Sequence, residues 1–173
     1  MEKEKYALIA EGSSETAILD ILLDNEKLLF TRKDLLARQV IRTRNARDFE
    51  AEYLSKAISS PITVYRILDS KNEKFNLSKF YTNTITVVNV VTSPEIEILI
   101  IIDAGHYDKF KKKSSIKPSS YCKNILRMSK IKSYDFVKSY FNDCNKLVYA
   151  IIEYARVTKH SKDYLTLYDL LKK

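Results

Sequence analysis

Acidic side chains follow three apolar segments of the sequence, each at the point where the segment ends. They are Glu11 after residues 6–10, Asp69 after residues 62–68, and Glu95 and Glu97 after residues 84–91. If the segments are parallel strands, these carboxylates lie at one edge of a sheet, where open α/β sheets hold their sites. Converging carboxylates repel one another unless a cation lies between them. Oxygen ligands with few histidines suit Mg²⁺ or Mn²⁺.

Such an ion activates water and clamps a phosphate oxygen, which is the chemistry of phosphodiester cleavage. In this hypothesis Glu11, Asp69 and Glu97 hold the metal, and Glu15 and Glu95 support it. Lys71, or a lysine between residues 109 and 117, stabilises the negative charge that develops on the phosphate during cleavage. The alternative is that these acids only cap helices and solvate turns.

The stretch 6–23 predicts the element that positions the first acid. Residues 6–10 have the length and apolar character of a buried strand, Glu11-Gly12 makes the turn, and helical apolar spacing follows. Ser13 or Ser14 is the predicted cap of that helix, and Glu15 lies in its first turn, where a carboxylate favours the helix dipole.

The following elements alternate between predicted helices and strands. Residues 34–44 are ambiguous, with a first half that suits a short helix and an end that suits a strand. Asn45 predicts the cap of a helix that runs through Ala57. Residues 62–68 predict a strand, and residues 84–91 predict the central strand of the sheet because they are apolar on both faces.

The remaining chain predicts helices around a basic connection. Ser93 and Pro94 predict a helix N-cap and first helical position, and Gly105 predicts the end of that helix. Residues 109–118 read as a flexible basic connection. Helical apolar spacing recurs in the segments 121–128, 134–141, 147–154 and 164–171. We therefore expect a single domain, with an α/β core over 1–110 and a helical extension over 111–173 packed on it.

Composition favours a polyanionic partner and a reduced compartment. The 173 residues carry a net charge of +8, and basic side chains cluster at two places. The predicted nucleic-acid contacts are Arg42, Arg44, Lys111, Lys112, Lys113 and Lys117. Cys122 and Cys144 lack histidines at ligand spacing, which argues against zinc and favours free thiols. No apolar run is long enough to span a bilayer, and the expected location is the cytoplasm.

A family resemblance follows from these motifs. Glu11-Gly12-x-x-Glu15, followed by a strand ending in Asp69, resembles the Toprim fold of topoisomerases, primases and OLD-family nucleases. The stretch 93–101 is similar to the Asn-Pro-Cys-Phe-Glu-x-Trp-x-Leu-Leu helix of RloB-like Toprim proteins, with Pro94 on the family proline and Glu97 on its glutamate. The resemblance implies a Rossmannoid parallel sheet and a magnesium-dependent nuclease of bacterial defence or mobile elements, often beside an ATPase.

The sequence departs from that family at the second metal-binding acid. Toprim proteins carry Asp-x-Asp, whereas this chain has Asp69-Ser70-Lys71, and Glu73 replaces the missing acid only if the turn folds back. The family histidine after the apolar helix also falls on Asp103. The alternative function is therefore a non-catalytic regulatory subunit that binds nucleic acid or an ATPase.

Overall fold

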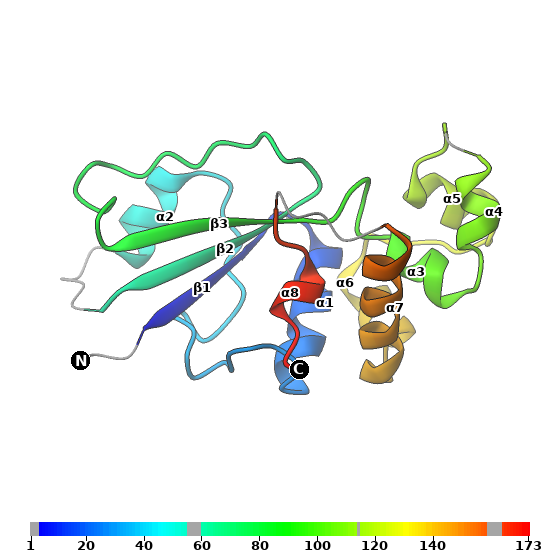
Figure 1. Cartoon of the computed structure of the whole chain (residues 1–173), viewed down its shortest axis with the longest axis horizontal. Coiled ribbons are helices and arrows are strands. Elements are labelled where there is room, and N and C mark those ends of the chain that lie inside the picture. The colour runs from blue at the N-terminus through cyan, green and yellow to red at the C-terminus, as the bar shows by residue number, and fades with distance from the viewer. Residues whose placement is uncertain (1–3, 55–59, 114, 159–163) are drawn as a thin grey trace.

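The computed structural model describes residues 4–54, 60–113, 115–158 and 164–173. Its centre is a sheet of three parallel strands in the order β1-β2-β3 (Figure 1), which confirms the predicted α/β class. The strands are β1 (Lys5–Ala10), β2 (Ile62–Leu68) and β3 (Ile85–Val91). Lys5 pairs with Ile62, and Ile62 pairs with Ile85, so the three carboxyl ends lie at the same edge.

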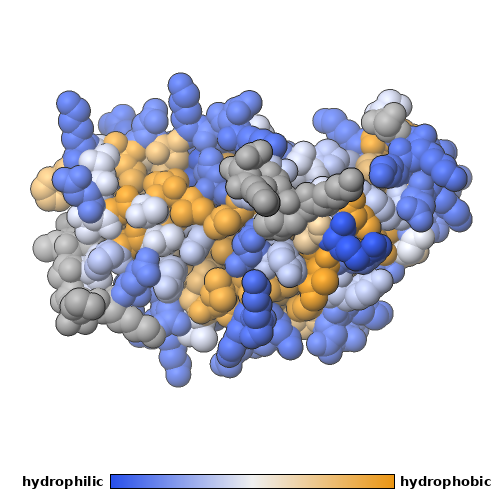
Figure 2. All heavy atoms as spheres, viewed as in Figure 1, coloured by the Kyte–Doolittle hydropathy of each residue, from blue (hydrophilic) through white to orange (hydrophobic). Residues whose placement is uncertain are grey.

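The two faces of the sheet bury separate cores, because successive strand residues point to opposite faces. One face packs against α2 (Ala46–Tyr53) through side chains such as Ile9, Val64 and Phe49. The other face contributes Leu8, Ala10 and Ile67 to a larger core, which includes the buried side of α1 (Ser13–Asp24). Figure 2 shows apolar side chains over the strands and hydrophilic ones over the far end of the molecule.

The strand predicted to be central lies at the edge of the described sheet. β2 occupies the middle, and the described residues give β3 only one bridge on its other side, between Val90 and Leu165. β2 and β3 are joined without a helix: the connection runs across the α2 face and packs Phe75 and Leu77 into that core. Apolar character on both sides of β3 reflects this cover and not a central position.

The structure defines the ambiguous segment 34–44 and the start of the helix after it. Residues 34–44 form no helix; they run along β1 and bridge it at Leu35 and Ile41. Asn45 caps α2 as predicted, since its side chain accepts a hydrogen bond from the Asp48 backbone N–H. The α2 helix ends at Tyr53, and the predicted end at Ala57 lies outside the described residues.

The predicted helix caps at Ser13, Ser14 and Ser93 are wrong. Gly12 occupies the cap position of α1, and neither neighbouring serine caps it. The apolar helix α3 (Ile98–Asp103) begins five residues after Ser93, and Glu97 takes its cap position. Gly105 does end this helix as predicted, with a left-handed φ of 69° that glycine adopts without strain.

The C-terminal helices pack on α1 and α3. Chain order gives α4 (Tyr107–Lys111), α5 (Pro118–Asn124), α6 (Tyr134–Tyr140), α7 (Cys144–Val157) and α8 (Leu167–Leu170). The helix α4 occupies the start of the predicted flexible connection. α7 lies against α3, and α6 lies against α1. No described helix combines the length and the apolar character that a membrane crossing requires.

Candidate active site

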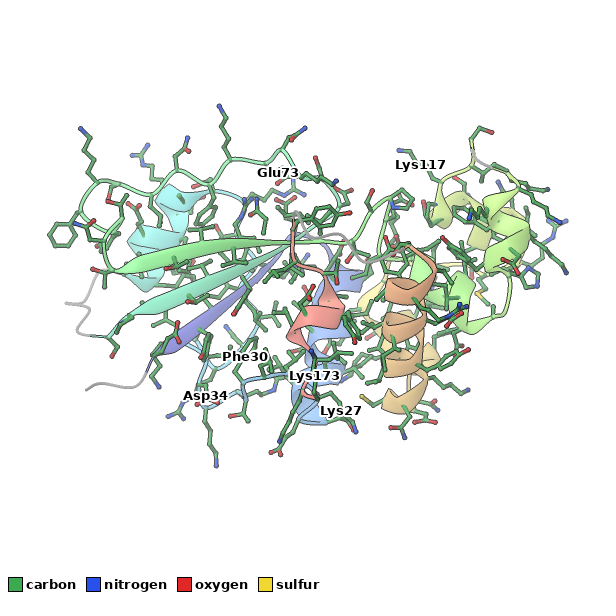
Figure 3. All side chains as sticks on the ribbon, viewed as in Figure 1. Lys27, Phe30, Asp34, Glu73, Lys117 and Lys173 are labelled. Carbon is green, nitrogen blue, oxygen red and sulfur yellow. The ribbon has the colours of Figure 1, made fainter. Side chains whose placement is uncertain are left out.

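Glu11 forms a carboxyl pair with Glu73 at the carboxyl edge of the sheet. The two side chains interact closely enough that a hydrogen bond with Glu73 is among the causes that raise the pKa of Glu11. Burial raises the pKa of Glu11, and the neighbouring Glu73 charge raises it further. Figure 3 shows Glu73 close to the ends of the strands, so the turn after β2 does fold back. The two acids therefore meet although 61 positions separate them in the sequence.

A buried arginine holds Glu73 in this place. Arg66 lies on β2 with only 2% of its surface exposed, and its Nη2 is 3.3 Å from Glu73 Oε2. Its Nη1 donates to the Glu73 backbone carbonyl and to Asn89 Oδ1, and the guanidinium lies 4.7 Å from the centre of the Phe75 ring. The Nε of Arg66 has no hydrogen-bond partner among the described residues. The loop is thus fixed over the strand by charge and stacking together.

Two predicted nucleic-acid contacts lie beside Glu11. Arg44 Nε is 3.9 Å from Glu11 Oε2, and Arg42 Nη2 donates to Ser13 Oγ at 3.4 Å. Both arginines are exposed and follow the bridge between Ile41 and β1. Arg44 also lowers the pKa of Glu11, against the larger effect of burial. Arg42 and Arg44 therefore form an exposed cationic border beside Glu11, called the arginine rim below.

Glu97, which the sequence places at the metal, lies in the other core. Only 3% of its surface is exposed, and its Oε1 accepts a hydrogen bond from Ser14 Oγ at 3.1 Å. Glu15 Oε2 lies 3.2 Å from the same hydroxyl. The Glu15 carboxylate also covers Gly12: a Cβ there would lie 2.1 Å from Oε2, so a larger residue would require the Glu15 side chain to move. Burial raises the pKa of Glu97.

Glu95 serves a structural connection. Its Oε2 accepts the backbone N–H of Ser119 at 2.9 Å, and its Oε1 lies 3.2 Å from Lys132 Nζ. Although burial acts in the opposite direction, these contacts lower the pKa of Glu95. The carboxylate thereby ties the segment before α3 to the start of α5.

The other predicted site residues are dispersed. Asp69 is exposed, and Lys71 places its ammonium 4.1 Å from the centre of the Tyr164 ring. Lys111, Lys112, Lys113 and Lys117 are exposed around the end of α4 and the start of α5. Figure 3 shows Lys117 well apart from Glu73. The lysines therefore form a second basic surface, separate from the arginine rim.

The predicted metal ligands do not form one cluster. Among the described residues, no three Asp, Glu, His or Cys side chains gather closely enough to hold a metal ion, so Glu11, Asp69 and Glu97 are not such a group. Magnesium in proteins is commonly held by one or two carboxylates, with water and substrate phosphates as the other ligands. The Glu11–Glu73 pair fits that smaller set, and Mg²⁺ or Mn²⁺ at this edge stays a prediction.

Sequence reasoning missed Arg66, Ser14 and Asn89. One signal was present, because an arginine inside the apolar segment 62–68 needs a buried acidic or carbonyl partner. The next acid along the chain after Asp69 is Glu73. Ser14 and Asn89 gave no comparable signal, since serine and asparagine are ordinary at turns and on half-exposed strands.

Comparison with known proteins leaves the Toprim resemblance untested. Neither the protein-family models, nor the curated proteins, nor the solved structures include a match to this chain. The function is therefore argued from the geometry of the site.

Proposed function

We propose that this protein cleaves nucleic-acid phosphodiester bonds with a divalent cation, Mg²⁺ or Mn²⁺, at Glu11 and Glu73. The observation that carries the proposal is the meeting of these two carboxyl groups at the carboxyl edge of the sheet, beside Arg44. Two neighbouring carboxyl groups that raise each other's cost of ionisation are suited to bind a cation between them, because the cation relieves the repulsion. Glu97 has no part in this site, because it is buried against Ser14.

Each group near the pair has a defined task. Arg66 keeps Glu73 directed at Glu11, and Arg42 and Arg44 attract the phosphate backbone of the substrate. A bound cation supplies activation of water and stabilisation of charge on the phosphate. The exposed Asp69 lies directly after β2 at the same edge, where it is accessible to solvent and substrate.

One observation favours the alternative of binding without cleavage. Arg44 and Arg66 each lie beside one member of the pair and partly neutralise it. The carboxyl groups therefore have countercharges even without a metal. In that case the same arginine rim binds nucleic acid or an acidic surface of a partner ATPase.

The first prediction separates these functions. Glu11→Gln and Glu73→Gln each keep the shape of the side chain but remove a charged metal ligand, so each should abolish cleavage of DNA or RNA oligonucleotides in Mg²⁺ or Mn²⁺. Wild-type protein should also melt at a higher temperature with Mn²⁺. At a Mn²⁺ concentration a hundred times the dissociation constant, binding adds about 2.7 kcal/mol to the free energy of unfolding. Both variants should lose that increase.

Glu26→Gln is the matched control, because Glu26 is an exposed acid in the turn after α1. It should keep both cleavage and the metal effect. Because Glu11 must lose its proton to bind metal, metal affinity should also rise with pH. Absence of both cleavage and metal-induced stabilisation in the wild type would leave only the binding function. Metal-induced stabilisation without cleavage calls for the same assay with an ATPase partner added.

A further inference from the structure

A pocket of about 480 Å³ lies beside β3. This volume is within the range of ligand sites, about 300–1,000 Å³. Three separate parts of the chain line it: the strand, the loop after β2, and the segment before α8. The lining residues are Lys71, Val87, Val88, Asn89, Val91, Tyr164 and Leu165.

Asn89 connects this pocket with the carboxyl pair. Its Oδ1 accepts from Arg66 Nη1 at 3.4 Å, and the same guanidinium bonds to Glu73. Among the described residues, the Asn89 side-chain amide donates no hydrogen bond, so its N–H groups are available inside the pocket. A ligand that bonds to Asn89 is therefore connected to Glu73 through the Arg66 guanidinium.

The pocket offers three kinds of contact that suit a nucleotide. Tyr164 provides an aromatic ring, and the exposed Lys71 holds its ammonium over that ring, 4.1 Å from the centre. Valine side chains provide apolar walls, and the Asn89 amide provides donors for the edge of a base. Aromatic rings beside cations are the means by which proteins bind single strands, since each base has a stacking face and each phosphate a charge.

We propose that this pocket holds an unpaired base, so that the substrate is single-stranded where it is cleaved. This proposal rests on the proposed function, because the assignment of a nucleic-acid substrate depends on cleavage at Glu11 and Glu73. A base inside a duplex is stacked and paired and does not reach such a pocket. On binding, the Lys71 ammonium moves from the Tyr164 ring to the phosphate beside the base.

The experiment measures binding by the full chain in EDTA, so that cleavage plays no part. Fluorescence anisotropy compares a labelled single-stranded DNA, the same sequence as RNA, and a duplex. Tyr164→Ala should weaken single-strand binding by roughly tenfold or more, as expected for loss of one stacked base. Tyr164→Phe should retain it, and duplex binding should not change. The control is Tyr149→Ala, which removes an exposed tyrosine on α7 outside the pocket.

Each outcome decides the proposal. Unchanged single-strand binding in Tyr164→Ala, or an equal loss for the duplex, overturns it. If melting shows that Tyr164→Ala does not fold, Tyr164→Leu keeps an apolar side chain without the ring and should show the same loss. A wild type that binds single strands through Tyr164 but never cleaves them refutes the nuclease and keeps the base pocket. If the wild type and Tyr164→Ala cleave single strands equally well, the nuclease function stands and the base pocket is refuted.

Discussion

The two carboxyl pairs of this molecule differ in what surrounds them, although each includes a glutamate that follows a strand of the same sheet. Glu11 and Glu73 meet beside the exposed Arg44, with Arg66 behind them. Glu97 and Glu15 share the hydroxyl of Ser14, and Glu97 lies in the larger core. The first pair is open to solvent and to anions, whereas the buried member of the second is closed to both. Residue type and strand position are therefore insufficient to assign chemistry.

The pKa is raised at one glutamate of each pair, Glu11 and Glu97, but the surrounding charges act on the two differently. Burial is the largest cause for Glu11 and for Glu97. At Glu11 the next cause is the Glu73 charge, which a metal or a phosphate-bound cation relieves. At Glu97 a backbone hydrogen bond and then the Lys132 charge oppose burial, while the Glu15 and Glu95 charges add to it. The neighbours of Glu11 are therefore exposed or half-exposed charges, whereas Glu97 is set mainly by its burial and by its hydrogen bond with Ser14 of α1.

The largest effect is expected at the arginine behind the first pair. Arg66→Ala removes a fully buried side chain that forms the ion pair with Glu73 and packs on the Phe75 ring. The Glu73 carboxylate is 37% exposed and stays hydrated, so the main cost is the cavity left by a fully buried side chain, and the free energy of unfolding should fall by about 2–5 kcal/mol. Urea denaturation followed by circular dichroism measures the loss.

The control for this prediction is Arg44→Ala, since Arg44 is exposed and lies 3.9 Å from Glu11. Exposed ion pairs contribute little, so the unfolding free energy should change by at most about 1 kcal/mol. Equal effects of the two substitutions would mean that burial does not distinguish the arginines. The comparison between an anchored and an open countercharge would then be wrong.

The sheet was predictable because its signals are local. Apolar runs at 6–10, 62–68 and 84–91 give the three strands, and the acids at their ends follow from the same pattern. The grouping of side chains was not predictable, because it depends on a loop without regular structure. Phe75 and Arg66 bring Glu73 to Glu11, and no periodicity records that contact. The position of β3 at the edge was missed for the same reason, since neighbouring chain can bury a strand as a sheet does.

A smaller loss is expected from the serine of the second pair. Ser14→Ala removes the hydroxyl that donates to Glu97 and leaves a buried carboxyl group without this partner. The cost of an unsatisfied buried group is about 1–3 kcal/mol. Thermal melting at neutral pH should therefore show a lower transition temperature. Ser13→Ala is the adjacent control, because among the described residues the Ser13 hydroxyl has a single hydrogen bond, accepted at 3.4 Å from the exposed Arg42. Similar melting of both variants would contradict a structural role for the second pair.

The smallest expected effect is a gain in stability at Glu97, and it depends on pH. Glu97→Gln keeps an oxygen that can accept from Ser14 but removes the ionisation of a buried group. The pKa of Glu97 is higher in the folded state than in the unfolded state, where it is about 4.3. Its contribution to stability is therefore complete at a pH below the unfolded-state pKa and is lost as the pH rises through the folded-state pKa. The variant should therefore melt above the wild type at pH 8.

This advantage of Glu97→Gln should shrink as the pH falls toward about 4, where the wild-type carboxyl is protonated in both states. Glu11→Gln should show the same sign with a smaller difference, because Glu11 is less buried and has Arg44 and Arg66 beside it. Melting curves of the two variants and the wild type between pH 4 and pH 8 provide the comparison. A Glu97→Gln protein that is less stable than the wild type at pH 8 would show that Glu97 is charged and stabilised in the fold. The second pair would then belong, like the first, among sites that hold charge.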